Sequence, residues 1–182
     1  EQAAGKITAV IEKGQPQGSA ARMMTSGNDT TLIVFSDDMD KALASLVIAN
    51  GAAGAGKKVT VFFTFWGLNV IKKVKKPKVK KDFMGFMFGL MLPSSLHKLS
   101  LSKLSMGGMG NWMMKGRMKS LKIDSLQEML DSAVASGVRM VACTMSMDVM
   151  GVKKEELIDC VESGGVATML DAADSSRATF FI

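Results

Sequence analysis

The stretch TLIVFSDDMDKALASLVIANGAAGAGKKVTVFFTF, residues 31 to 65, decides the fold class. It opens with one continuous apolar run (31–35) and closes with another (59–65), the pattern of strands that are buried on both faces of a parallel sheet. Between the two runs, SDD at 36–38 offers helix N-cap residues, apolar side chains recur at helical spacing, and the glycine-rich stretch 51–56 ends the helix. The stretch therefore predicts a strand, a helix and a second strand in succession.

The alternation of strands and helices continues to the end of the chain. Ser125 and Glu128 have the spacing of a capping box, and the helix that they start is closed by Gly137. After it the sequence predicts a strand at 138–142, a helix at 153–163 with Leu157, Ile158 and Val161 facing inward, and strands at 166–170 and 179–182. Five strands that alternate with helices predict an α/β domain with a mostly parallel sheet and helices on both faces.

The first thirty residues have a different character from the rest. KITAVI at 6–11 is typical of a short strand, and the stretch 15–30 is rich in Gly, Ser, Gln and Asn, which is linker composition. A lone strand followed by a linker is hard to place in a compact fold. We therefore expect residues 1–14 to be the end of a preceding domain, 15–30 to be a linker, and 31–182 to form the α/β domain.

The chain has two cysteines and one histidine, and no apolar run reaches the roughly 18 residues of a membrane span. So few cysteines favour a reducing compartment, and we expect a cytoplasmic protein. A Ser-His-Asp triad would need His97 as its base, and a metal site of several Cys and His ligands cannot be assembled within one chain. The sequence thus predicts neither a metal site nor a cofactor.

The net charge of +6 comes from one place, because seven lysines lie within residues 72–81 and the balance without them is −1. A lysine run of this kind is either a solvated loop or a docking site for an acidic partner or an anionic membrane surface. Few aromatic side chains are interleaved with these lysines, and stacking on bases needs such side chains. We therefore do not expect nucleic acid as a partner.

Eight of the seventeen methionines lie within residues 83–118, where we expect two or three short helices around loops at Pro93 and at Gly107-Gly108. Methionine fills irregular cores and adaptable binding surfaces, so this Met-rich section is interpreted first as core or as an oligomer interface. Two alternatives stay open, namely Cu(I) binding through thioethers and contact with a membrane surface.

Three polar or reactive groups follow predicted strands, at 36–38, 64–67 and 143–146, and ligands of open parallel sheets bind beyond the carboxyl ends of the strands. Cys143 is the strong nucleophile among them. It precedes a turn, and a helix N-terminus favours the reactive thiolate. The alternative is a buried structural thiol. Cys160 lies beside the inward stripe of the helix expected at 153–163, so we expect it to be packed, with a Cys143–Cys160 redox pair left open.

Particular segments resemble the larger, Met-rich branch of the DsrE/DsrF sulfur-relay family: FFTFWG at 62–67, LSMGGMGNWMMKGRMK at 104–119 and ACTMSMDVMG at 142–151. The resemblance covers residues 31–182. It implies a three-layer α/β/α sandwich that oligomerises with its own copies and carries sulfane sulfur as a persulfide. Of the functional residues of the family, only Cys143 carries over. GKITAVIEKG at 5–14 is similar to the last strand of a TusA-like sulfur carrier domain, which implies TusA-like or rhodanese-like donor and acceptor proteins.

The resemblance and the strand ends together give an expected site. Cys143 is its catalytic group, and backbone N–H groups of Thr144, Met145, Ser146 and Met147 are expected to stabilise a persulfide anion. Phe65 and Trp66, with the Met-rich section, are expected to form a dry wall, and Asp37 to line the same edge. The residues leave open whether the protein is an enzyme or a carrier. The alternative function is a non-catalytic interaction or membrane-surface docking module that uses the Lys-rich and Met-rich segments.

Overall fold

The structure is a computed structural model. It describes residues 28–74, 95–103 and 106–182, together with the single residues 77, 79, 87, 89, 91 and 93. The strand expected at 6–11, the linker and most of the lysine run lie outside the described residues.

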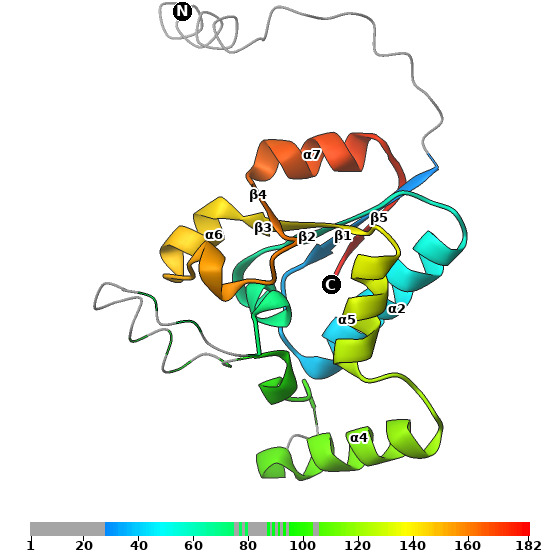
Figure 1. Ribbon diagram of the computed structural model, residues 1–182, viewed down its shortest axis with the longest axis vertical. Helices are drawn as coiled ribbons and strands as arrows, with labels where there is room; N and C mark the ends of the chain where they lie inside the picture. Colours follow the sequence, from blue (N-terminus) through cyan, green and yellow to red (C-terminus); the bar gives the residue numbers. More distant parts are fainter. Residues whose placement is uncertain are drawn as a thin grey trace, which may run out of the picture.

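The core of the fold is a five-stranded sheet in which every pair of neighbouring strands is parallel (Figure 1). Its order is β4-β3-β2-β1-β5. The strands are β1 (Asp29–Val34), β2 (Val59–Phe63), β3 (Arg139–Cys143), β4 (Glu162–Gly164) and β5 (Ser176–Phe181). The first four lie side by side in chain order, and β5 then returns to the free side of β1. The predicted strands at 31–35, 59–65, 138–142 and 179–182 are thus confirmed, with ends that differ by a few residues.

Helices cover both faces of this sheet, which confirms the three-layer α/β/α sandwich (Figure 1). The helices α2 (Met39–Gly54) and α5 (Leu126–Ala135) pack side by side on one face, where the Asn50 side chain donates to the Met129 carbonyl at 2.9 Å. The other face carries α7 (Val166–Asp174). The remaining helices are α4 (Met109–Ser120), α6 (Thr144–Val149) and the 3-10 helices η1 (Phe65–Ile71), η2 (Leu96–Lys98), η3 (Met106–Gly108) and η4 (Lys154–Glu156).

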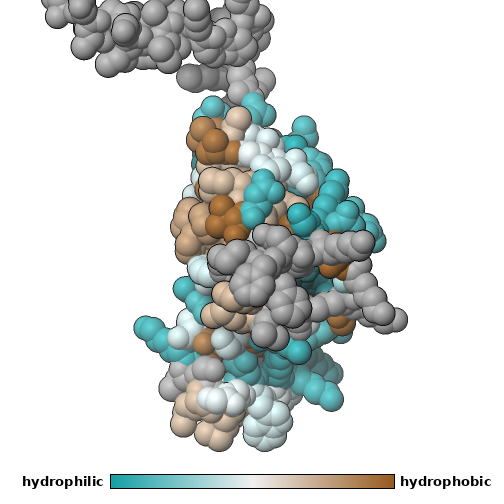
Figure 2. Space-filling model, turned by 90° about the vertical axis from the view of Figure 1, so that its left-hand side faces the viewer, coloured by the Kyte–Doolittle hydropathy of each residue, from teal (hydrophilic) through white to brown (hydrophobic). Residues whose placement is uncertain are grey.

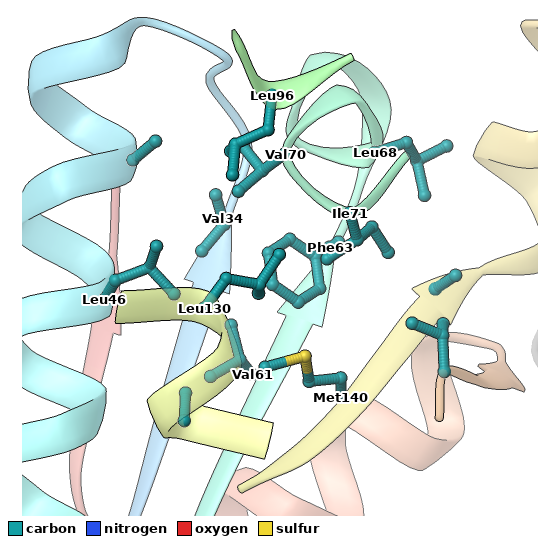
Figure 3. Packing of buried hydrophobic residues seen from close by; sticks show 14 of the residues in the cluster. Val34, Leu46, Val61, Phe63, Leu68, Val70, Ile71, Leu96, Leu130 and Met140 are labelled. Atoms are coloured by element: carbon teal, nitrogen blue, oxygen red, sulfur yellow. The ribbon is translucent and has the colours of Figure 1, made fainter. Parts of the chain in front are cut away.

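The main core lies between the sheet and the pair α2 and α5 (Figure 3). Side chains of a strand point alternately to its two faces, so Val61 and Phe63 of β2 and Met140 of β3 meet Leu46 of α2 and Leu130 of α5 on the same side. A second, smaller cluster occupies the opposite face, beneath α7. The two faces are therefore unequally packed, because α7 has no buried residue in its own length.

The helix predicted after Ser125 is confirmed as α5. The Ser125 hydroxyl accepts from the Glu128 N–H at 3.3 Å, and the Glu128 carboxylate accepts from the Ser125 N–H at 2.7 Å. These reciprocal bonds hold the pKa of Glu128 below its usual range. The capping box therefore fixes where α5 begins, and the sequence predicts it from the spacing of Ser125 and Glu128.

Two predictions near the C-terminus are wrong. Residues 153–163 do not form a helix but the 3-10 helix η4 and then the strand β4, and residues 166–170 begin the helix α7 instead of forming a strand. Leu157, buried as predicted, lies in a bridge to Lys72 rather than on a helical stripe. The physical reason is tertiary pairing. Glu162 to Gly164 add to the edge of β3, and Arg139 Nη2 meets Glu162 Oε2 at 2.8 Å across the two strands.

Short helices do form in the described part of the Met-rich section, as expected. They are η2, η3 and α4, and the last two residues of η3, Gly107 and Gly108, lie in the left-handed region at φ 66° and 100°. In the part of the chain that the structure describes, no helix is long and apolar enough to span a bilayer.

Candidate functional site

The carboxyl ends of the parallel strands bring the predicted site segments to one edge of the sheet. Phe35 to Asp38 follow β1, Thr64 to Gly67 follow β2, and Cys143 ends β3. Two contacts tie these segments together. The Gly67 N–H donates to the Phe35 carbonyl at 2.8 Å, and the hydroxyls of Thr64 and Ser146 lie 2.8 Å apart.

Cys143 is the last residue of β3 and is only 6% exposed. It forms a small apolar cluster with Phe62 and Val141, against which the partly buried Ile33 and Met169 pack. Val141 and Cys143 are two residues apart, so both side chains point to the face that α7 covers. The thiol therefore lies in an apolar setting between the sheet and Met169 of α7.

Gly164 allows α7 to approach so closely at this point. It pairs with Cys143 across the β3–β4 ladder. A Cβ on Gly164 would lie 2.7 Å from Cγ1 of Val141, closer than real Cβ contacts, and 3.1 Å from Cβ of Thr168, which is a tight contact. The absence of a side chain is therefore what seats the start of α7 against β3, beside the cysteine.

The four residues after Cys143 form the first part of α6. Thr144 and Met145 are exposed, whereas Ser146 and Met147 are buried. The Thr144 hydroxyl donates to the Gly164 carbonyl at 3.5 Å, so it links α6 to the end of β4. The first N–H groups of any helix lack partners within that helix, and here they belong to the residues expected to stabilise an anion. That role stays a prediction.

Phe65 lies in a different group of side chains, and Trp66 is exposed. The Phe65 ring centroid is 5.5 Å from that of Phe35, which in turn stacks on Phe181 at 6.0 Å. Phe65 has φ 46°, a conformation that a bulky side chain rarely adopts, and Trp66 is 41% exposed. Among the described residues, the cluster around Cys143 includes neither of them. The apolar side chains that lie around the cysteine come from the sheet and α7, and the dry wall of Phe65, Trp66 and the Met-rich section stays a prediction.

Asp37 is held by a buried neighbour. Its carboxylate accepts from the side-chain amide of Asn69 at 2.8 Å, and Asn69 is fully buried in η1. This bond joins the loop after β1 to the 3-10 helix after β2. It holds the Asp37 carboxylate at this edge of the sheet, and the part of Asp37 in the site stays a prediction.

Cys160 is exposed, so the expectation that it is packed beside a helical stripe is wrong. It lies in the turn before β4. This turn lies outside the ladder of β3 and β4, which begins at Glu162, and both cysteines are free thiols. A redox pair of Cys143 and Cys160 stays a hypothesis.

The sequence predicted the place of Cys143 at the end of a buried strand but not the side chains that surround it. Phe62 was signalled by the alternation of sides along β2. Met169 was assigned to a strand, so no helix was expected above the cysteine. The described residues contain no cluster of three or more His, Cys, Asp or Glu side chains that could hold a metal ion.

The chain is an α/β sandwich in which a cysteine lies at the carboxyl end of an inner parallel strand and is covered by apolar side chains. These features define a class of thiol-bearing α/β proteins. Within that class the chain belongs to the DsrE/DsrF/DrsH-like family, whose model matches residues 27–181. It is 43% identical over 153 residues to the uncharacterized protein YrkE of Bacillus subtilis, covering 84% of this chain and 96% of the relative. It is 34% identical over 155 residues to the sulfur carrier protein DsrE2 of Allochromatium vinosum, covering 83% and 96%.

Among solved structures, the chain is similar to the ychN protein from E. coli, with a TM-score of 0.49 and 12% sequence identity. The match covers 85% of this chain and 99% of that one. Membership of the family confirms the resemblance on which the sulfur-relay role was expected.

Proposed function

We propose that the protein carries sulfane sulfur as a persulfide on Cys143 and passes it to a partner thiol. The observation that carries the proposal is the position of Cys143, at the end of β3 and enclosed by an apolar cluster, in a chain of this family. A relative that shares 34% of its residues with this chain is named a sulfur carrier, which supports the same role here.

The transfer is a balanced exchange of one sulfur atom. The Cys143 thiolate attacks the outer sulfur of a donor persulfide, R–S–SH, and the S–S bond of the donor breaks as the new bond forms. The donor leaves as its thiolate, and Cys143 holds the sulfur as Cys–S–SH. An acceptor thiolate then attacks the outer sulfur, and the Cys143 thiolate leaves. No external oxidant or reductant is needed, because sulfane sulfur moves from one thiolate to the next.

The surroundings of Cys143 suit storage of such a group. Phe62, Val141 and Met169 leave the cysteine little exposed, and a persulfide enclosed by apolar side chains meets little water or soluble oxidant. The same enclosure means that a partner thiol must approach past α6 or the start of α7. Delivery therefore depends on a protein partner that fits this edge of the sheet.

The partners proposed are sulfur donor and acceptor proteins of the TusA-like or rhodanese-like kind, each presenting a cysteine. We further propose a cytoplasmic location, in keeping with two cysteines that are both free. A reducing compartment keeps Cys143 in the thiol form from which a persulfide is made. Whether the chain also speeds the transfer, as an enzyme would, is decided by comparing transfer rates with and without it.

The test is the mass of the intact protein and of its Cys143 peptide after incubation with a persulfide donor. The wild-type chain is expected to gain one sulfur atom on that peptide, and Cys143→Ser is expected to gain none. Cys160→Ser is the matched control, because Cys160 is the more exposed thiol and its removal should leave the gain intact. Retention of the added sulfur by Cys143→Ser, or its loss in Cys160→Ser, contradicts the assignment.

A further inference from the structure

The solvent side of α4 is apolar, which is the reverse of an ordinary surface helix. Met109, Trp112 and Met113 are 52%, 77% and 61% exposed, and Met106 just before the helix is 66% exposed. Positions 109, 112, 113 and 116 recur at helical spacing, so these side chains and Gly116 share one face. In Figure 2 this end of the molecule, below the residues drawn in grey, shows apolar side chains on its surface.

The opposite side of α4 is fixed to the rest of the molecule. Met118 is buried, and the Asn111 side chain both donates to the Leu99 carbonyl at 2.9 Å and accepts from the Leu101 N–H at 2.8 Å. Lys115 Nζ donates to the His97 carbonyl at 3.0 Å. These contacts set the rotation of the helix about its axis. The apolar face therefore cannot turn inward without breaking them.

A shallow hollow of about 640 Å³ runs along this exposed face, lined chiefly by Leu101, Met106, Met109, Trp112, Met113 and Met114. Among the described residues that line the hollow, Arg117 is the one with a charged side chain. Single exposed apolar side chains are normal on proteins, but a continuous apolar surface of this kind marks a contact site.

The charged residues of α4 itself are all basic, and the acidic Glu128 lies on its inner side, where it lines a hollow with Lys115 and Lys119. Arg117 and Lys119 belong to the last part of the helix, and Lys122 follows it. Residues 83–123 contain no acidic residue, and residues 68–123 carry thirteen Lys or Arg against one Asp. The rest of the chain carries ten Lys or Arg against sixteen Asp or Glu. The positive charge of the protein is thus concentrated in the segment that holds the apolar face.

We infer that α4 docks on the surface of an anionic lipid bilayer, with its Met and Trp face in the interface and its cations on the headgroups. Apolar side chains flanked by Lys and Arg are the design of helices that lie in the interface plane. Tryptophan prefers that depth, and each nearby cation adds attraction to anionic headgroups. A second copy of the chain is the less suitable occupant, because a two-fold contact through α4 would bring two positive segments together.

The inference is independent of the sulfur chemistry. In Figure 1, α4 lies at the bottom of the described domain and α7 lies toward its top. A protein seated on lipid through α4 leaves α7, and the cysteine cluster beneath it, away from the bilayer. Cys143→Ser is therefore expected to bind vesicles as the wild type does.

The experiment is co-sedimentation of the full chain with vesicles of phosphatidylglycerol or of phosphatidylcholine. We expect binding to the first and little to the second, and weakening as salt rises from about 0.05 M to about 0.5 M. The double variant Trp112→Gln, Met113→Gln should bind at least about tenfold more weakly, because it removes apolar contact and keeps every charge. Val149→Gln on α6, where Val149 is 59% exposed, is the matched control and should bind normally.

A second readout comes from tryptophan fluorescence. The chain has two tryptophans, so Trp66→Phe leaves Trp112 as the only reporter, and its emission should shift to shorter wavelength on anionic vesicles. Equal binding to both lipids overturns the inference. Full binding by the double variant also overturns it, and would assign binding to the lysine run alone. Absence of binding overturns it too, and a smaller assembly mass of the double variant in light scattering would then identify a second copy as the occupant.

Discussion

At Gly67, where the chain passes from β2 into η1, there is no space for a side chain. A Cβ at this position would lie 2.1 Å from the carbonyl oxygen of Val34 and 2.8 Å from its carbonyl carbon, so backbone would have to move. The same residue donates its N–H to Phe35. The glycine therefore allows the loop after β2 to lie directly on the end of β1, and this contact sets the position of Trp66 and Thr64 at the edge.

We expect Gly67→Ala to lower the free energy of unfolding by about 3 kcal/mol, the upper end of what overpacking costs in a rigid site. Gly51→Ala is the matched control. Gly51 is an exposed residue within α2 and has open space around it, so alanine there should raise stability by about 0.5–1 kcal/mol through helix propensity. Urea unfolding followed by circular dichroism measures both. Equal midpoints for the two variants would contradict the packing that the structure shows.

At the residue scale the sequence predicted the place of Cys143, at the end of a buried strand, and left its environment open. Cys143 was identified because it directly follows an apolar run, a local property. Met169 and Gly164 come to it through the pairing of β4 with β3 and the return of α7 over the sheet. These contacts join segments that are far apart in the sequence, and one of the segments folds differently from what its own residues indicate. No local sequence pattern therefore predicts them.

At the element scale, α5 is the helix whose start the sequence specifies fully. Ser125→Ala removes the side-chain acceptor for the Glu128 N–H, and we expect a loss of about 1 kcal/mol of stability. Ser132→Ala, an exposed site within the same helix, is the control and should change stability little or raise it slightly. Chemical denaturation of both variants checks this. A smaller loss at Ser125 than at Ser132 would mean that the capping box does not hold α5.

The same capping box carries a pH dependence. The Glu128 carboxylate has a lowered pKa in the folded protein, because it accepts the Ser125 N–H. A lowered folded pKa gives stability that is fully present above the ordinary glutamate pKa of about 4.3 and is lost as pH falls through the folded value. We expect the unfolding midpoints of wild type and Glu128→Gln to converge between about pH 5 and pH 3. A gap that widens over this range would contradict the assignment.

The two elements that the sequence did not predict share a physical cause. β4 has three residues, Glu162 to Gly164, with no apolar pattern of its own, and exists because it extends the edge of β3. The apolar residues at 166–170 are typical of a buried strand, but they form a helix that covers the sheet loosely. Long, regular elements such as α2 were predictable from periodicity, whereas a short edge strand and a thin covering helix depend on their neighbours.

At the scale of the whole molecule, the face opposite α2 and α5 is incompletely covered. Val166 and Leu170 of α7 are 65% and 52% exposed, and Phe181 of the edge strand β5 is 69% exposed. An edge strand with exposed apolar side chains is a template for pairing with another chain. The expected homo-oligomer stays a prediction, and these residues are where we place its contact.

We therefore expect light scattering to give a mass above that of one chain for the wild type and a lower mass for Phe181→Lys, because a lysine on an edge strand opposes pairing. Val47→Lys on α2 is the control. Val47 is 52% exposed on the other face of the sheet and should leave the assembly unchanged. A wild-type protein that is monomeric at high micromolar concentration, or equal effects of both variants, would contradict this placement.

The strand order of the sheet is a property of the whole molecule that the sequence does not predict. Apolar runs and helix signals were enough for a three-layer sandwich with a parallel sheet. The strand order β4-β3-β2-β1-β5 was not accessible, because it depends on the crossing of α7 from one sheet edge to the other. The position of Cys143 beneath that crossing follows from the order and was equally out of reach.

The direction of β1 has a consequence for anything joined to the chain before it. β1 enters the sheet at Asp29, at the amino edge, whereas Cys143 lies at the carboxyl edge. A tethered carrier would have to travel around the sheet, at least the length of a six-residue strand, or about 20 Å. The fourteen residues from 15 to 28 can span at most about 50 Å when fully extended. If residues 1–14 end a carrier domain, as the sequence predicts, a linker of this reach would allow the carried thiol to meet Cys143, and its length would set how often it does so.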